Sequence, residues 1–535
     1  MSHRDRLAVL YSNQVVFDRS GEPLVSVRIT EGQDEVTVQS RGRLTLLPGG
    51  DDGARIRARA GTAWTVHVEA ARPGEVRWWT IVEELPAGDL DAAADARRRW
   101  SALGGPVKLL ESGALIGLAG QTLDTRRLHV GIDPQPTRAE AEAVAERLAT
   151  GRELRTAVIA EPTTRPGGWI VARDPKTGFE VRARDLLWLT PEAGHTIDVP
   201  GLEWGHGTPK RGRADRRYHG DVYLAVGSDA KLTVVNVLSA ETLLEGVVPA
   251  ELFPSAPPAA LRAQAVAARG QLLAKVGTRH RSDPYLLCAE THCQVYAGDS
   301  QAKKRTTAAV RATRGQLLFD AHGLVDTTYS SACGGHSEAF HQMWGGAPKA
   351  SSPGRFDLLG GATDPIAEPP ITDAAVAAFI DRPPDAFCRP SAERAGVWRW
   401  TRTRTGAEVD AAVDAHATAR DRPPIAPIHT IRALRRGVSG RALAVEYLGR
   451  GGRHVVEGSY TNRTLLGGLR SGMWVVERRG GAPDGAPDTR TFRGGGFGHG
   501  VGLCQHGAIG MARAGHDHPA ILGHYYPGGA LRTAW

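Results

Sequence analysis

The sequence predicts an α+β protein built from more than one module. Residues 1 to about 85 show the alternating apolar pattern of short strands, residues 128–160 alternate strand and helix signals, and strong strand signals after Tyr218 precede one long helix. A chain of 535 residues is also too long for one ordinary hydrophobic core, so two or three domains are expected.

The first module, residues 1–86, is expected to be a β-rich accessory module. Glycine and aspartate at residues 49–53 mark a turn between two strands. The strand pattern recurs at residues 24–29, 35–38, 64–68 and 78–82. The chain starts with only a short apolar stretch before Ser12, which favours a first strand over a secretory signal.

Residues 87–203 are expected to form a small α+β module. Residues 128–132 have the pattern of a strand, residues 136–148 that of a helix with Thr137 as its N-cap, and residues 154–160 that of a second strand. This unit resembles a sporulation-related (SPOR-like) repeat, a module that binds glycan strands. A generic α+β insert fits the same pattern.

The third module, residues 218–535, is expected to follow a linker at residues 204–217, which are rich in proline, glycine and arginine. Residues 222–226 and 232–237 have strong strand signals. A helix is predicted over residues 258–275, with Pro258 in its first turn and an apolar stripe made by Leu261, Ala265, Ala268 and Leu272.

Composition and charge exclude several classes of protein. No run of about 18 apolar residues occurs, so no transmembrane segment is predicted. The net charge of +8 suits an acidic cell-wall polymer, or simply reflects a preference for arginine over lysine, and no aromatic–basic platform or helix-turn-helix spacing indicates nucleic acid. The five cysteines are too few and too uneven for a disulfide framework, but three of them fall between Cys288 and Cys333, which indicates a site.

Three segments of the third module carry a family pattern. They are residues 235–254 running into 260–269, residues 283–298 followed by 329–338, and residues 494–512 followed by 521–528. Together they resemble the SpoIID/LytB family, which contains the lytic transglycosylase stage II sporulation protein D and the LytB amidase enhancers. The resemblance implies a SpoIID-like catalytic domain over residues 218–535 and leaves residues 1–200 outside it.

Glu251 is the residue onto which the resemblance carries the family's catalytic carboxylate, because Val247-Val-Pro-Ala-Glu-Leu252 matches the family's Val-Val-Pro-x-Glu-Met. An apolar flank disfavours the charged form of a carboxyl group, as a general acid near neutral pH requires. Ordinary hydrolysis needs a second carboxylate, and Glu241, Glu245, Glu290 and Glu338 leave that alternative open. Without the resemblance, Glu251 would be a helix-terminal charge.

Cys288, His292 and Cys293 place two thiols and an imidazole within six residues, and these are zinc ligands by type. The resemblance implies a structural zinc ion at this segment. His280, Cys333 and His336 compete as fourth ligand, and Cys333 is preferred. Buried core residues or a disulfide are the alternatives.

Substrate-binding residues are expected in the second and third segments, where hydroxyls, amides and close backbone approach suit a sugar groove. They are Gln294, Tyr296, Ser330, Ser331, Gly334, Gly335, His499 and Gln505. Ordinary turn chemistry accounts for each of them equally well. Thr242, Leu243, Leu252 and Cys504 depart from the residues that the family commonly has.

The function expected from the resemblance is cleavage of the β-1,4 bond between N-acetylmuramic acid and N-acetylglucosamine in denuded peptidoglycan strands, with a 1,6-anhydro product. A non-catalytic enhancer that binds a cell-wall amidase is the alternative, and a zinc-dependent hydrolase is a weaker third. The substrate implies that the protein acts in the cell envelope or periplasm.

Overall fold

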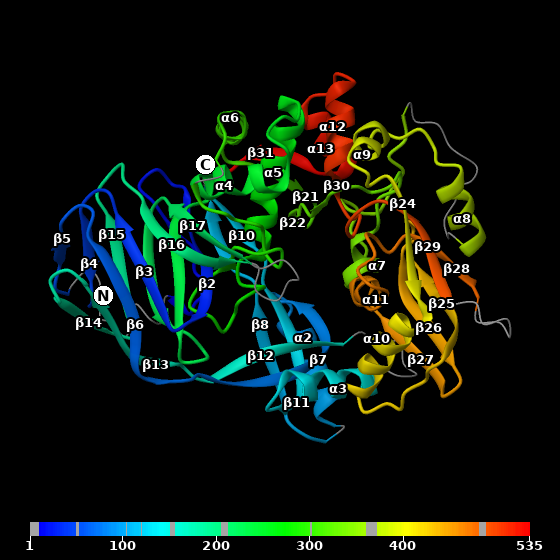
Figure 1. Ribbon diagram of the computed structural model, residues 1–535, viewed down its shortest axis with the longest axis horizontal. Coiled ribbons are helices and arrows are strands. Elements are labelled where there is room, and N and C mark those ends of the chain that lie inside the picture. Colours follow the sequence, from blue (N-terminus) through cyan, green and yellow to red (C-terminus); the bar gives the residue numbers. More distant parts are fainter. Residues whose placement is uncertain are drawn as a thin grey trace. The chain divides into compact units, whose positions relative to one another are not determined.

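The computed structural model describes residues 10–49, 53–102, 104–118, 120–149, 156–204, 212–299, 302–359, 372–480 and 488–535 (Figure 1). The chain divides into two compact units. The first contains residues 1–254, 268–317 and 532–535, and the second contains residues 255–267 and 318–531. Both units combine helices with mainly antiparallel sheets, which confirms the α+β class.

An eight-stranded sheet forms the centre of the first unit, with the order β1-β2-β19-β18-β15-β4-β5 and β20 added beside β2. Its strands are β1 (Val16–Phe17), β2 (Pro23–Gln33), β4 (Leu44–Leu47), β5 (Ile56–Ala58), β15 (Leu186–Pro191), β18 (Asp221–Val226), β19 (Leu232–Ser239) and β20 (Leu287–Cys288). Every residue of β18 after Asp221 is buried, as the apolar run in the sequence predicts for a central strand.

Residues 1–86 and 218–535 are expected from the sequence to fold as separate modules, but this sheet contains strands from both. β2 pairs with β19 along most of its length, and β15 pairs with both β4 and β18. Strands from residues 16–58 and from residues 186–239 therefore share one sheet, because pairing partners in a sheet need not be neighbours in sequence.

A second, six-stranded sheet has the order β14-β13-β6-β3-β16-β17. Its strands are β3 (Glu35–Ser40), β6 (Ala63–Arg72), β13 (Gly167–Arg173), β14 (Glu180–Arg184), β16 (Ile197–Trp204) and β17 (Gly212–Tyr218). Residues 204 and 212–217 of the predicted linker belong to β16 and β17, which pair antiparallel. Residues 205–211 of that prediction lie outside the described residues.

Between β6 and β13 the chain forms a β-α-β-β-α-β module, in which two helices accompany a four-stranded sheet of order β12-β7-β11-β8 (Figure 1). Its elements are β7 (Glu75–Pro86), α2 (Leu90–Ser101), β8 (Val107–Ser112), β11 (Arg127–Gln135), α3 (Arg138–Ala149) and β12 (Ala157–Thr164), with the hairpin β9 (Leu115–Leu118) and β10 (Gln121–Asp124) between β8 and β11. Val82, Ala96 and Val130 are buried together between helix and sheet.

The predicted strand, helix and strand of residues 128–160 therefore all exist. Thr137 caps α3 as expected: its hydroxyl accepts from the N–H of Glu140, whose carboxylate accepts from the N–H of Thr137. The module begins earlier than residue 87, because β7 belongs to it and not to the preceding strands.

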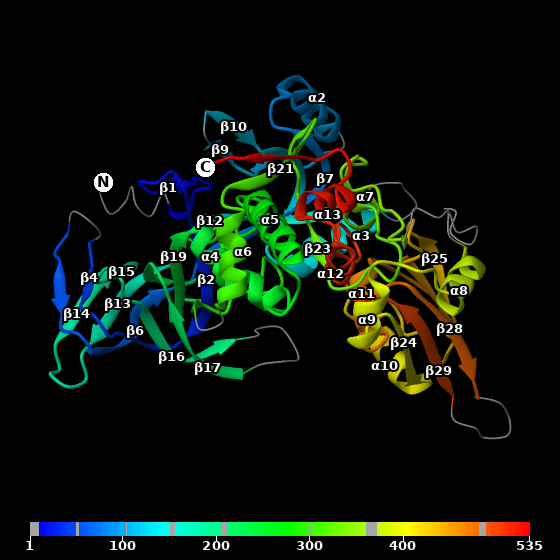
Figure 2. The same cartoon turned by 90° about the horizontal axis from the view of Figure 1, so that it is seen from above.

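In the second unit, two three-stranded sheets enclose the main core (Figure 2). They are β24 (Arg399–Thr405), β29 (Thr489–Gly495) and β28 (Trp474–Arg479), and β25 (Ile428–Arg436), β26 (Ala442–Gly449) and β27 (Gly452–Glu457). Trp400, Val413, Tyr447 and Phe492 pack in this core. The helix α10 (Gly406–Thr418) begins with a capping box between Thr405 and Glu408.

The remaining helices and short strands complete the two units. They are α4 (Ala240–Glu251), α5 (Pro258–Lys275), α6 (Lys304–Ala312), β21 (Gln316–Asp320), β22 (Gly323–Leu324), β23 (Tyr329–Ser330), α7 (Phe340–Trp344), α8 (Asp373–Asp381), α9 (Arg389–Arg394), α11 (Ser459–Leu465), β30 (Leu503–Cys504), α12 (Gln505–Arg513), α13 (His518–Tyr525) and β31 (Ala530–Thr533). Pro258 opens α5, as predicted. Among the described residues, no helix has both the length and the hydropathy that a membrane span needs.

Candidate functional site

Glu251 is the last residue of α4 and lies half-buried at the point where that helix ends. The helix begins where β19 stops, because the Ser239 hydroxyl accepts from the N–H of Thr242 at 3.2 Å and caps it. Val248 and Leu252 beside Glu251 are buried, while Phe253 is 57% exposed. Two of the three apolar residues that flank Glu251 therefore lie inside the protein, and the third faces solvent.

Segment 293–296 holds Glu251 in place. The backbone N–H of Val295 donates to Oε1 of Glu251 at 3.1 Å. On either side of Val295, the buried Gln294 and Tyr296 anchor the segment. Sequence reasoning did not identify Val295, because a backbone donor leaves no signature in residue type.

Gln294 and Tyr296 have different surroundings from those expected for sugar-binding residues. The Gln294 amide donates to the carbonyl of Ala268 at 2.8 Å, and the Tyr296 hydroxyl donates to Oδ1 of Asn236 at 2.9 Å. A Cβ on Gly246 would lie 2.7 Å from the Tyr296 ring, so this ring packs directly against α4. Tyr296 therefore packs against the Glu251 helix from the interior, while Gln294 is bound to α5.

The other candidate carboxylates are held in different ways. Glu241 receives two 2.8 Å hydrogen bonds from Arg269, Glu245 pairs with Arg311 at 3.0 Å, and Glu290 pairs with Arg28 at 3.1 Å. These three lie in the first unit with Glu251.

Glu338 lies in the second unit and is completely buried. Burial raises the pKa of its carboxyl group, against the hydrogen bond from the Ser439 hydroxyl. Its carboxylate also accepts from the N–H of Ala339 at 2.9 Å, so the group is part of an interior network.

The predicted metal ligands Cys288, His292 and Cys293 come together, and His280 joins them. One donor atom from each of the four lies within 4.8 Å of the others, and His292 Nδ1 is 3.7 Å from Cys288 Sγ and 3.8 Å from Cys293 Sγ. A set of two thiols and two imidazoles fits tetrahedral zinc. His280 thus occupies the place for which the sequence analysis preferred Cys333.

The two thiols of this cluster differ in the direction of their pKa shifts. Hydrogen bonding from Cys293, and further bonds from His280 and His292, lower the pKa of Cys288 despite its burial. The interaction with Cys288, together with burial, raises the pKa of Cys293 well above its usual value. A cation at the centre would stabilise both thiolates.

Cys333 lies in the second unit, in a separate group with Asp357, Cys388 and Cys504. His336, the other competing ligand, is also in the second unit, where burial lowers its pKa to about 4. Its Nδ1 lies 2.6 Å from the carbonyl oxygen of Ser337.

The structure brings together the remaining predicted substrate residues, all in the second unit. β23 pairs in parallel with β30, so that Ser330 lies opposite Cys504, and Ala332 forms a bridge with Phe497. The backbones approach closely, because a Cβ on Gly334 would lie 2.8 Å from the nitrogen of Gly496. This arrangement places Ser330, Ser331, Gly334 and Gly335 beside the segment that carries His499 and Gln505.

Their side chains are not equally accessible. Ser330 and Gln505 are 7% exposed, and the Gln505 amide lies 3.3 Å from Gln264. His499 is half-buried and accepts from the N–H of Val501 through Nδ1. Of these residues, His499 and Ser331 present more surface than Ser330 or Gln505.

Two exposed aromatic residues near His499 did not stand out in the sequence. Trp344 is 50% exposed, and its ring centroid lies 4.9 Å from that of His499. Phe497, two residues before His499, is 41% exposed. Large exposed apolar side chains are typical of binding surfaces, and flat aromatic rings suit the C–H face of a sugar.

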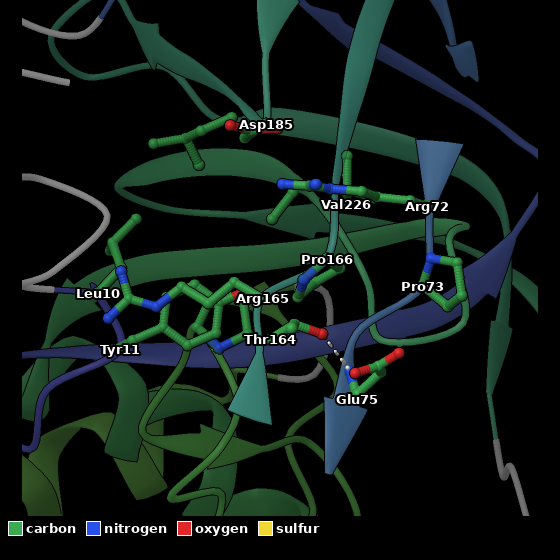
Figure 3. Close-up of a pocket in the computed structure, with 13 residues that line it drawn as sticks. Leu10, Tyr11, Arg72, Pro73, Glu75, Thr164, Arg165, Pro166, Asp185 and Val226 are labelled. Carbon is green, nitrogen blue, oxygen red and sulfur yellow. Dashed lines mark hydrogen bonds between the residues drawn. The ribbon is translucent and has the colours of Figure 1, made fainter. Parts of the chain in front are cut away.

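A cavity of about 570 Å³ lies elsewhere in the first unit, where the chain leaves β6 and returns in β13 (Figure 3). The guanidinium of Arg165 stacks over the ring of Tyr11, 4.7 Å from its centroid. Burial raises the pKa of Tyr11 to about 12, against the effect of Arg165. None of the predicted site residues lines this cavity.

The Cys/His cluster predicts a metal-dependent stability of the first unit. Protein purified without added metal is expected to hold about one zinc ion there, and Cys293→Ser should remove it. The variant should also unfold at lower temperature, because zinc would fix residues 288–293. Metal analysis and thermal unfolding with and without chelator measure both effects. Unchanged zinc in Cys293→Ser would contradict the assignment.

Two family models match separate segments of the chain. The family described as SpoIID, stage II sporulation protein, matches residues 228–319, and a domain of unknown function, DUF8618, matches residues 338–502. An uncharacterized protein of Brachyspira hyodysenteriae is 26% identical over 316 residues, which cover 58% of this chain and 71% of that protein.

The amidase enhancer of Bacillus subtilis is 27% identical over 310 residues, which cover 54% of this chain and 40% of the enhancer. A crystal structure of a Burkholderia pseudomallei protein covers 43% of this chain and 46% of its own, at 14% identity, with a TM-score of 0.16. That score carries no argument about the fold. α4, Glu251 and the Cys/His cluster all fall inside segment 228–319, so the resemblance of this part of the chain to the SpoIID/LytB family is confirmed.

Proposed function

We propose that the protein is a peptidoglycan lytic transglycosylase. It cleaves the β-1,4 bond between N-acetylmuramic acid and N-acetylglucosamine, in glycan strands without stem peptides, and leaves a 1,6-anhydro-N-acetylmuramoyl end. The proposal includes the cell envelope or periplasm as its place of action, because the substrate is there.

One observation carries this proposal: Glu251 stands at the partly exposed end of α4, inside the segment that matches the SpoIID family, and the backbone N–H of Val295 holds its carboxyl group. The carboxylates of Glu241, Glu245 and Glu290 are each bound to an arginine within the protein, so none of them is placed as a second catalytic carboxylate. A mechanism with one acid–base carboxylate fits this arrangement better than hydrolysis with two.

In the proposed mechanism, Glu251 first donates its proton to the glycosidic oxygen as the bond to C1 of the N-acetylmuramoyl residue breaks. The resulting carboxylate then accepts the proton of the C6 hydroxyl of the same sugar, whose oxygen closes the 1,6-anhydro ring at C1. No water is consumed. The Val295 N–H orients the carboxyl group through Oε1.

Zinc at His280, Cys288, His292 and Cys293 would supply structural stabilisation of the segment that leads to Val295. Glu251 itself carries out both proton transfers. Cys293 is only two residues before Val295, so the cluster acts on the site by positioning.

Digestion of purified denuded glycan strands tests the proposal directly. The products are expected to carry anhydro ends, one water molecule lighter than hydrolysed ends. Reducing ends would show instead that water is the nucleophile. The measurement is mass spectrometry of the released fragments.

A second function is favoured by the Bacillus relative, which is named an amidase enhancer. In that case the protein binds the cell wall and a cell-wall amidase without cleaving the glycan strand. Stimulation of an amidase by a protein that releases no glycan fragment would support the enhancer.

The exposed aromatic residues predict where glycan binds in the second unit. Trp344→Ala and Phe497→Ala are each expected to weaken binding to glycan strands by about 1–2 kcal/mol, because each ring would bury about half its surface against sugar. Tyr460→Ala is the matched control, since Tyr460 is 76% exposed in the same unit but outside segments 330–344 and 497–505. Equal losses in all three variants, measured by co-sedimentation with glycan, would contradict a specific role.

A further inference from the structure

Three thiols and one carboxylate meet inside the second unit, and the proposed function does not use them. They belong to Cys333, Asp357, Cys388 and Cys504, and one ligand atom from each lies within 4.8 Å of the others. Their exposed fractions are 0%, 1%, 0% and 0%. Such a set of ionisable groups is costly to bury without a compensating cation.

Two of the distances between these groups match the edges of a tetrahedral zinc site, and the distance between two sulfurs is too long for a disulfide. Cys333 Sγ lies 3.6 Å from Cys388 Sγ and 3.5 Å from Oδ2 of Asp357. Zinc bonds of about 2.3 Å to sulfur and about 2.1 Å to oxygen give tetrahedral edges of about 3.8 Å and about 3.6 Å. A disulfide needs about 2.05 Å between sulfurs and would leave the third thiol unmatched.

We propose that Cys333, Asp357, Cys388 and Cys504 bind a second zinc ion, separate from the Cys/His cluster of the first unit. Three thiolates and one carboxylate complete a four-coordinate shell. No position remains for water or substrate, so the ion is structural.

The groups around the ligands already have the orientation that such a site requires. Cys504 Sγ accepts backbone N–H groups from Cys333 at 3.2 Å and from Gly507 at 3.3 Å. Asp357 accepts from the Tyr525 hydroxyl at 2.7 Å through Oδ1, and from the N–H of Cys388 at 3.0 Å through Oδ2. Hydrogen bonds of this kind fix the direction of metal ligands.

The surroundings leave little space for change. A Cβ on Gly507 would lie 1.9 Å from the Tyr525 hydroxyl oxygen and 2.9 Å from Asp357 Oδ2. His524 Nε2 lies 3.4 Å from Oδ1 of the same carboxylate, which further restricts its position.

The four ligands come from separate segments of the chain. Cys333 follows β23, Cys388 precedes α9 and Cys504 caps α12, while Asp357 pairs through its backbone with Gly335 and Phe387. The ion would therefore tie together residues 330–335 and 497–505, which contain most of the predicted substrate residues.

Zinc content of the full chain tests the proposal. Wild-type protein should hold about two zinc ions, and Cys388→Ser or Asp357→Asn should hold about one. The matched control, Cys293→Ser, should lose the ion of the first cluster and retain the other. Circular dichroism checks that each variant is folded.

X-ray absorption at the zinc edge of Cys293→Ser identifies the remaining ligands, and a first shell dominated by sulfur supports the proposal. Zinc that is unchanged in both Cys388→Ser and Asp357→Asn would overturn it. If Cys388→Ser does not fold, Asp357→Asn and the wild type decide. A Cys333–Cys388 disulfide, seen as a loss of two hydrogen atoms in the mass of the denatured unreduced wild type, would also overturn it.

Discussion

Glu251→Gln is expected to lower the rate of glycan-strand cleavage by at least about 10²–10⁴-fold, the usual contribution of a positioned proton donor. Glutamine keeps the size of the side chain and can still accept the Val295 N–H through its carbonyl oxygen. It has no proton that it can transfer to the glycosidic oxygen. Binding of glycan strands should therefore stay within a few-fold of the wild type.

Glu245→Gln is the matched control for this variant. Glu245 lies in the same helix and pairs at the surface with Arg311, whose side chain is 73% exposed. The variant loses this ion pair. Such pairs contribute about 0–1 kcal/mol, so cleavage should be almost unchanged. Equal activity of Glu251→Gln and wild type would remove Glu251 from the mechanism.

If the protein is an amidase enhancer, the same experiment gives a different result. If neither the wild type nor Glu251→Gln cleaves glycan, and both stimulate a cell-wall amidase equally, the protein acts through binding. If only the wild type cleaves, catalysis is established, whether or not an amidase is also stimulated.

Local patterns in the sequence predicted local structure well. The strand, helix and strand of residues 128–160 and the start of α5 at Pro258 are set by apolar spacing and capping groups within a few residues. Pairing of β2 with β19 joins segments about two hundred residues apart, and no such spacing encodes it. The sequence predicts a domain boundary near residue 204, but long-range pairing joins the strands on both sides of it into one sheet.

The same limit applies to the sites. Cys288, His292 and Cys293 are close in sequence, and the structure brings them together. Cys333 is predicted to join them because its Gly-Gly segment is expected near the same cleft, but the fold places Asp357, Cys388 and Cys504 around it instead. Val295 could not be found at all, since it acts through its backbone.

Arg269→Met is expected to lower the free energy of unfolding by about 3–5 kcal/mol, the cost of leaving one partner of a buried ion pair without the other. Arg269 is fully buried, and its guanidinium donates two 2.8 Å hydrogen bonds to Glu241. The Glu241 carboxylate also accepts from the N–H of Gly315 at 3.0 Å and from Trp535 Nε1 at 3.1 Å. These two donors remain in the variant, but they carry no charge.

Arg311→Met is the control for this stability prediction, because it removes the exposed partner of Glu245 and should change the free energy of unfolding by less than about 1 kcal/mol. Denaturant unfolding measures both variants. The double variant Arg269→Met/Glu241→Leu should recover part of the loss, since no unpaired buried charge remains. A loss below about 1 kcal/mol for Arg269→Met would mean that the pair is not a structural element. Glu241 would then return as a candidate second carboxylate, and products with reducing ends would have to be sought.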